Sequence, residues 1–208
     1  MPPIHWLKVS ELTKTTDCKN LAPIWEDLAK VFSTEPGVLI AKVDAEAENS
    51  KALATEQGVQ SYPTIKWFKK GSTEPSPYDG PRTIGDFVDF INTNSGTHRT
   101  PGGGLDVTGG TIEALDTIIS TFKGVYTTGA EDVKKAAAGL TDKYAQYYVK
   151  VFDKLSKNEG YAEKELKRLQ GLIGKGNLAP EKLDDLTSRS NILRKFLGTD
   201  DDEEKSEL

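Results

Sequence analysis

The chain has 208 residues and a formal net charge of −5, a length that accommodates one or two domains. Apolar residues make up 36% and charged residues 28%, and no apolar run approaches the ~20 residues of a bilayer-spanning helix, so we expect a soluble protein with no membrane partner. The single cysteine, Cys18, excludes an internal disulfide bond and a cysteine-based zinc site, and we expect neither a metal nor a cofactor.

Residues 18–95 predict an alternation of helices and strands. In residues 18–33, apolar side chains recur every three or four positions, which indicates an amphipathic helix. Gly58 is a typical helix C-cap, and Thr83 with Asp86 resembles a capping box that opens a later helix. The predicted elements are a helix at 18–33, a strand at 38–43, a helix at 48–57, a strand at 64–68, a short edge strand near Tyr78 and a helix at 83–91.

The second half of the chain has a different composition and periodicity. Residues 96–110 contain glycine runs at 102–104 and 109–110 without apolar periodicity, which predicts a linker or a long loop. Beyond it the pattern is helical throughout and predicts a five-helix bundle over residues 111–197. The expected helices cover 111–122, a segment that starts at 128, 142–157, 161–173 and 180–197.

Charge is distributed unevenly along the chain. Residues 1–97 carry 10 basic and 13 acidic groups, residues 111–197 carry 15 and 12, and the tail at 198–208 carries one lysine and six acids. A small positive excess spread over several helices is weak support for nucleic-acid binding, so we expect no nucleic-acid partner. The acidic tail is typical of a disordered, solvated segment.

Several short motifs in residues 18–95 carry a resemblance to a known family. They are CKNLAP at residues 18–23, VDA at 43–45, QSYPT at 60–64 and GPRT at 80–83. Together they resemble an a-type, thioredoxin-like domain of the protein disulfide isomerase family, and residues 111–197 are similar to the all-helical domain that ends its PDI-D-type members. The resemblance therefore predicts an incomplete α/β thioredoxin-like domain followed by an all-α five-helix domain.

The resemblance also implies roles for individual residues. Pro63 is expected to be the family's cis-proline, which faces the active-site cysteines, and the backbone at Tyr62 is expected to pair with a bound polypeptide. Arg82 is expected near the active site, where a cation favours a thiolate. Cys18 is expected at the position of the resolving cysteine of a Cys-x-x-Cys motif. Metal ligands are not expected.

The active-site motif is incomplete in this chain. The attacking cysteine of the family belongs at position 15, where this sequence has Thr15. Cys18 in the first turn of its helix has two interpretations: a reactive thiol that the helix dipole activates and Asp17 opposes, or an inert, partly buried packing residue. We therefore expect weak or absent catalysis of disulfide exchange.

The N-terminal segment, residues 1–17, departs from the family. The family's first strand, first helix and central strand should precede Cys18, so either Ile4–Val9 replaces the central strand or the sequence is a truncated version of a longer enzyme. The last four residues, Lys205–Leu208 (KSEL), resemble an endoplasmic-reticulum retrieval signal, but no signal peptide is recognisable at the N-terminus. The resemblance implies the endoplasmic-reticulum lumen, whereas a complete chain without an entry signal would be cytosolic.

A tyrosine-rich stripe marks the helical half. Its members are Tyr144, Tyr147, Tyr148, Val151, Phe152 and Leu155. This spacing suits the core of the bundle, and the alternative is that Tyr147 and Tyr148 line the rim of a groove that binds unfolded polypeptide.

Three functions remain open from the sequence. The resemblance implies a disulfide isomerase of secretory proteins, whose partners are unfolded or misfolded polypeptides, with glutathione as the redox partner. The alternative is a non-catalytic chaperone or adaptor that binds polypeptide through the helical domain. A third is a cytosolic single-thiol redox protein that depends on Cys18.

Overall fold

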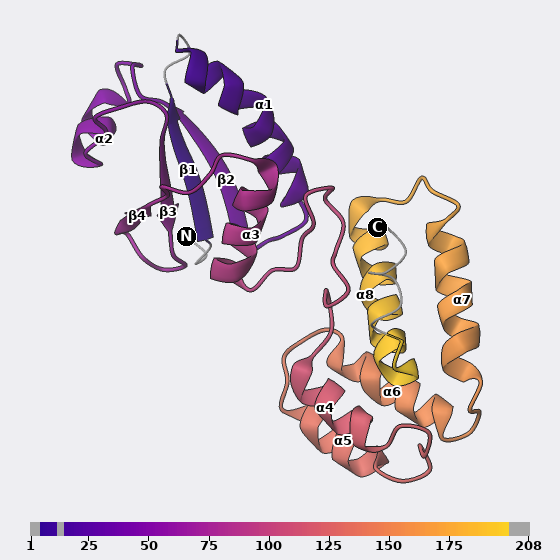
Figure 1. Ribbon diagram of the computed structural model, residues 1–208. Helices are drawn as coiled ribbons and strands as arrows, with labels where there is room; N and C mark the ends of the chain where they lie inside the picture. The colour runs from indigo at the N-terminus through magenta and orange to yellow at the C-terminus, as the bar shows by residue number, and fades with distance from the viewer. Residues whose placement is uncertain (1–4, 12–14, 200–208) are drawn as a thin grey trace. The chain divides into compact units, whose positions relative to one another are not determined.

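A mixed sheet with flanking helices and a helical bundle follow one another along the chain (Figure 1). The computed structural model describes residues 5–11 and 15–199. It divides into two units, Met1–Gly104 and Leu105–Leu208, and each unit has its own hydrophobic core. The predicted acidic tail lies outside the described residues from position 200 onward.

The first unit is built on a four-stranded sheet of order β2-β1-β3-β4. β1 pairs in parallel with β2 and antiparallel with β3, and β3 pairs antiparallel with β4. The strands are β1 (His5–Glu11), β2 (Val38–Asp44), β3 (Thr64–Phe68) and β4 (Pro75–Pro77). The N-terminal segment therefore supplies a central strand, as the first of the two alternatives predicts.

β2 lies at the edge of this sheet, with β1 as its partner strand. Val38 and Ile40 contact the core, whereas Leu39 is 41% exposed on the opposite side of the strand. This alternation follows from the period of two along a strand.

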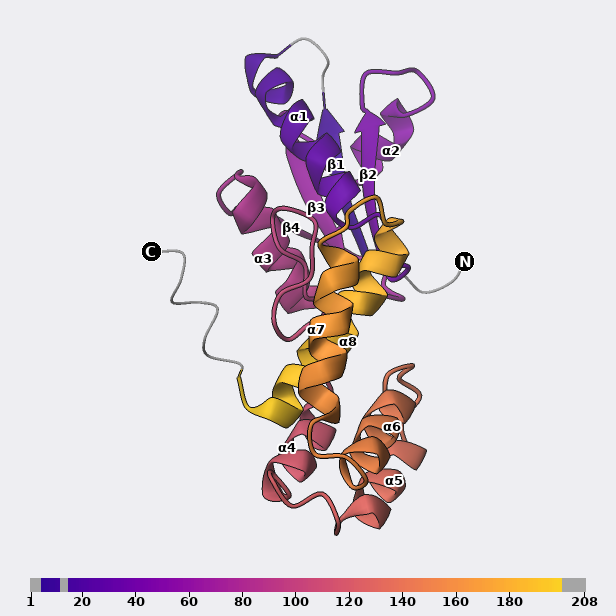
Figure 2. The ribbon, with the colours of Figure 1, turned by 90° about the vertical axis from the view of Figure 1, so that its right-hand side faces the viewer.

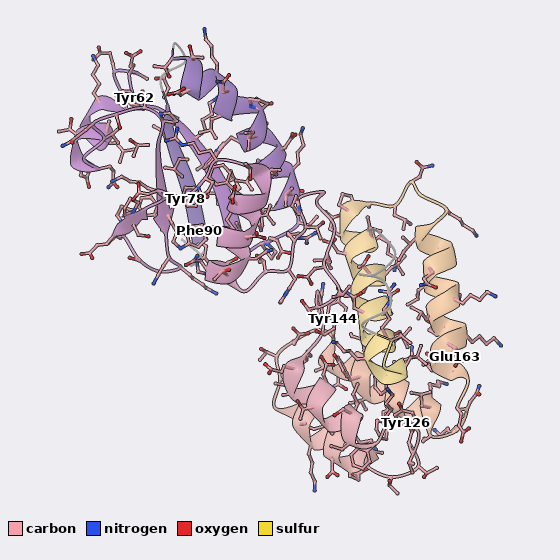
Figure 3. All side chains as sticks on the ribbon, viewed as in Figure 1. Tyr62, Tyr78, Phe90, Tyr126, Tyr144 and Glu163 are labelled. Carbon is pink, nitrogen blue, oxygen red and sulfur yellow. The ribbon has the colours of Figure 1, made fainter. Side chains whose placement is uncertain are left out.

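Two helices, α1 (Thr16–Val31) and α3 (Ile84–Ser95), cover one face of the sheet, and the short helix α2 (Lys51–Glu56) lies beyond the other (Figure 1). The core between sheet and helices is rich in aromatic rings, and Trp25 meets Phe87 edge to face with centroids 5.6 Å apart. The Trp25 indole also donates a hydrogen bond to the carbonyl of Ala41 in β2 (3.2 Å). Tyr78, in this core, and Phe90, packed against it, have ring centroids 4.9 Å apart, and Figure 3 labels both residues.

Several helices differ from their expected bounds, and two of the differences have a local structural cause. α2 is shorter than the predicted 48–57, because it buries no residue and the side chain of its N-cap residue Ser50 makes no capping hydrogen bond to the helix. α3 runs past Ile91 to Ser95 and ends at Gly96, whose φ of 70° is the left-handed conformation that favours glycine.

Within the described residues, the second unit holds five helices, which confirms the predicted bundle (Figure 2). They are α4 (Glu113–Thr121), α5 (Ala130–Ala138), α6 (Ala145–Leu155), α7 (Tyr161–Ile173) and α8 (Pro180–Leu197). α6 and α8 provide most of the fully buried side chains of this core. Pro180 stands in the first turn of α8, where its missing N–H costs no hydrogen bond.

Candidate functional site

Strand directions bring two distant segments to one end of the sheet. β1 runs antiparallel to β3, and Ser10 near the end of β1 lies opposite Thr64 at the start of β3. α1 follows β1, and the loop that contains Tyr62 and Pro63 precedes β3 (Figures 1 and 2). The beginning of α1 and the proline loop therefore meet at the same end of the sheet.

The first turn of α1 is organised by a hydroxyl at its N-cap. Thr15 has extended backbone angles, and its Oγ1 accepts a hydrogen bond from the backbone N–H of Cys18 (3.3 Å). Asp17 adds a negative charge to this turn, which the positive end of the helix dipole favours. Cys18 is 2% exposed and is a free thiol in the structure.

The proline loop contacts a cation from the segment before α3. The Tyr62–Pro63 bond is cis, as the resemblance implies. Pro63 is buried, and Tyr62 is half-buried at this end of the sheet (Figure 3). Arg82 donates a hydrogen bond from Nη2 to the carbonyl of Pro63 (3.4 Å). A hollow of about 180 Å³ lies beside Arg82 and is lined by Asp17, Asn20, Leu21, Ile24 and Arg82.

These contacts define what the site can do chemically. Cys18, Arg82, Tyr62 and Pro63 all belong to the region around the beginning of α1 and the proline loop, and Arg82 joins the two segments. Disulfide exchange needs a thiolate that reaches a disulfide sulfur, and a threonine hydroxyl does not replace it. The site therefore offers one buried thiol, Cys18, and lacks the second thiol that full exchange requires.

The prediction that Tyr147 and Tyr148 rim a groove is wrong for the structure, and the core interpretation holds. Tyr148 is fully buried, donates from Oη to Asp116 Oδ1 (2.5 Å) and accepts from the backbone N–H of Ile112 (3.0 Å). Tyr147 is 8% exposed, with the guanidinium of Arg189 over its ring at 5.1 Å. Burial raises the pKa of both phenols well above the ordinary value of 10.

The second unit has a surface hollow that the sequence does not indicate. It has a volume of about 370 Å³ and lies between α7, α8 and the chain that enters the unit. Apolar side chains of Leu105, Val107 and Ile173 share its wall with the polar Thr187 and Arg194. These residues come from three segments that no single periodic pattern connects, so no local feature of the sequence indicates the hollow.

Comparison with known proteins agrees with this two-part organisation. Residues 13–93 match the thioredoxin family model, and residues 110–196 match the model described as endoplasmic reticulum protein ERp29, C-terminal domain. Protein disulfide-isomerase tigA of Aspergillus niger is 61% identical over 92% of this chain. The chain belongs to the protein disulfide isomerase family.

Other members of the protein disulfide isomerase family match over the same span. Protein disulfide-isomerase erp38 of Neurospora crassa is 52% identical over 92% of this chain, and a probable protein disulfide-isomerase A6 of Medicago sativa is 39% identical over 86%. The matches cover 52%, 53% and 50% of the tigA, erp38 and A6 proteins, so the chain spans about half the length of these relatives. Among the described residues, no helix is long and apolar enough to cross a membrane.

Proposed function

We propose that the first unit binds extended segments of unfolded or misfolded secretory polypeptides at the proline loop, and that this chain exchanges disulfides weakly or not at all. The observation that carries the proposal is the first turn of α1, where the Thr15 hydroxyl is the N-cap and the lone Cys18 thiol is buried. Family membership supports the class of client, because the matched relatives are named protein disulfide-isomerases.

Full exchange needs two thiols in sequence. A thiolate at position 15 attacks one sulfur of a client disulfide, forms a mixed disulfide and releases the other client sulfur as a thiolate that takes a proton. The Cys18 thiolate then attacks the sulfur at position 15 and releases the second client thiol, and two glutathione molecules reduce the resulting disulfide while they become glutathione disulfide. With Thr15 the first of these bonds does not form.

Restoring the missing thiol tests this account. We expect Thr15→Cys to accelerate refolding of a scrambled-disulfide client in a glutathione buffer, while the unmodified chain refolds the client at the rate of buffer alone. The matched control is Thr15→Ser, which keeps an N-cap hydroxyl without adding a thiol. Cys18→Ser in the Thr15→Cys background should lower the yield of correctly paired client, because mixed disulfides then persist.

Two results would contradict the proposal. Acceleration by the unmodified chain that Cys18→Ser abolishes would show that the single buried thiol catalyses exchange. A folded but inactive Thr15→Cys variant would show that the end of the sheet does not position a client. Client binding is measured separately, by fluorescence anisotropy of a labelled, reduced and unfolded client, with Tyr62→Ala as the variant that should weaken it.

A second candidate is a non-catalytic chaperone that binds polypeptide through the helical unit. The observation that favours it is the hollow lined by Leu105, Val107 and Ile173, not the buried tyrosines. The Val107 side chain is 46% exposed, so Val107→Asp should then weaken client binding, while Tyr62→Ala leaves client binding unchanged. The opposite ranking of the two variants supports the proline loop.

The proposed compartment is the lumen of the endoplasmic reticulum, with glutathione as the redox partner. The match to the ERp29 C-terminal domain and the terminal Lys205–Leu208 sequence support this location. Fusing an entry signal to the chain and comparing secretion with and without these four residues tests the retrieval step: their removal should raise secretion.

A further inference from the structure

One face of α1 and the segment before α3 line a small hollow next to the proline loop. Its volume is about 180 Å³. Arg82 lines it and also donates to the carbonyl of Pro63 at 3.4 Å, so the hollow adjoins the loop. Spacings of three and four positions place the other lining residues on one face of α1: Asp17, Asn20, Leu21 and Ile24.

Two of the lining side chains are apolar and are held by the core of the first unit. Leu21 is 3% exposed and belongs to that core, and Ile24 packs against it. An apolar cavity of roughly 150 Å³ is large enough to bind one benzene ring. The hollow is therefore large enough for a single six-membered ring that lies against Leu21 and Ile24.

The charged side chains of the hollow offer hydrogen-bond partners of opposite kinds. An ionised carboxylate such as that of Asp17 only accepts hydrogen bonds, and the guanidinium of Arg82 only donates them. Among the described residues no ion pair joins these two side chains, so they do not neutralise each other by direct contact. A neutral hydroxyl can use both partners, because it donates and accepts, whereas a charged group is repelled by one of them.

We propose that the hollow binds a tyrosine side chain of the client, with its ring against Leu21 and Ile24 and its hydroxyl toward Asp17 and Arg82. A phenol combines the single ring that the volume admits with the hydroxyl that the two charges favour. The inference rests on the proposed function, because the client backbone has to lie along the loop at Tyr62. Side chains of an extended strand alternate between its two sides, so every second client side chain is directed to the same side of the loop.

Peptide binding to the full chain tests the inference. Three labelled, cysteine-free peptides differ only at one central position, which is tyrosine, phenylalanine or alanine, and fluorescence anisotropy gives their dissociation constants. We expect the tyrosine peptide to bind about tenfold more tightly than the alanine peptide, because its ring is buried, and about threefold more tightly than the phenylalanine peptide, because of its hydroxyl. Equal affinities for the tyrosine and phenylalanine peptides would overturn the inference.

A variant of the acceptor tests the role of the hydroxyl. Asp17→Ala should lower the preference for tyrosine over phenylalanine about threefold. The matched control is Glu26→Ala, which removes the same charge from an exposed position of α1 outside the hollow and should leave the preference unchanged. Circular dichroism checks that both variants fold, because Asp17 also lies at the positive end of the helix dipole. An unchanged preference in folded Asp17→Ala would contradict the assignment.

Nuclear magnetic resonance locates the bound ring. We expect nuclear Overhauser effects between the ring protons of the tyrosine peptide and the methyl protons of Leu21 and Ile24, since both side chains line the hollow. Contacts of the ring with Leu105 and Val107 in place of these would assign the tyrosine to the hollow of the second unit and would overturn the inference.

The variant Tyr62→Ala separates failure of this inference from failure of the proposed function. If the unmodified chain binds the three peptides equally and Tyr62→Ala weakens all of them, the proline loop binds backbone and only the inference about the hollow fails. If no peptide binds, or if Tyr62→Ala leaves every affinity unchanged, the proposed function fails and the inference fails with it.

Discussion

At the scale of single residues, Thr15 stabilises the start of α1 but cannot act as the nucleophile of disulfide exchange. The Thr15 hydroxyl satisfies the N–H of Cys18, one of the donors that a helix N-terminus leaves without an intrahelical partner. A thiol at this position is a weaker cap but a far better nucleophile. The first turn of α1 thus has a capped helix N-terminus and lacks the thiol that the proposed disulfide exchange would need at position 15.

Two adjacent tyrosines of α6 lead to a prediction about stability. Tyr148→Phe removes a hydroxyl that serves both Asp116 and the Ile112 N–H, and we expect a loss of about 1–3 kcal/mol in the free energy of unfolding of the helical unit. Tyr147→Phe is the matched control, because its buried Oη has no hydrogen-bond partner among the described residues. We expect that change to stay within about 0.5 kcal/mol or to stabilise the unit.

Chemical denaturation followed by circular dichroism measures both variants. Equal effects of Tyr147→Phe and Tyr148→Phe would contradict the hydrogen-bond account. The sequence places both residues on the apolar stripe of one helix, so their burial was predictable. It does not show which hydroxyl has a partner, because Asp116 and Ile112 are more than thirty positions away and only the fold brings them near.

At the scale of elements, local patterns predict helices better than they predict sheet order. The bounds of α7 and α8 agree with the expected ones, since the 3.6-residue period and the Pro180 signal are contained in the segments themselves. The position of β1 stayed open, because whether residues 4–9 form the central strand depends on pairing with β2 and β3. Whether a strand lies at the edge or in the centre of a sheet depends on the strands it pairs with, not on its own sequence alone.

One prediction concerns the approach of the chain to α8. Gly110 has a φ of 81°, and a Cβ there would lie 2.3 Å from the Ser188 Cβ and 3.0 Å from its Cα. We expect Gly110→Ala to destabilise the helical unit by about 2–4 kcal/mol, from left-handed strain and overpacking together. Gly176→Ala is the control: its φ is 68°, but nothing lies within 4 Å of the added Cβ, so only the ~1 kcal/mol strain applies.

A double variant isolates the contact from the strain. Gly110→Ala combined with Ser188→Gly should be less destabilised than the sum of the two single changes, because the second removes the clashing Cβ. Thermal unfolding of the four proteins gives the coupling energy. Strict additivity would show that backbone strain alone accounts for the effect.

At the scale of the whole molecule, the two cores predict two unfolding events with separate probes. All three tryptophans, Trp6, Trp25 and Trp67, belong to the first unit, so tryptophan fluorescence follows that unit alone. Far-ultraviolet circular dichroism includes the five helices of the second unit. We expect the two probes to give different denaturation midpoints, since each unit buries its own apolar side chains.

Two variants with local effects test whether the two units have separate denaturation midpoints. Tyr148→Phe should move the transition seen by circular dichroism and leave the fluorescence transition where it is, because its partners all lie in the second unit. Leu28→Ala, which empties a fully buried position under the sheet, should lower the fluorescence midpoint instead, at a cost of about 2–5 kcal/mol. If either variant shifts both probes equally, the two units unfold as one cooperative body, and the separate cores do not give separate transitions.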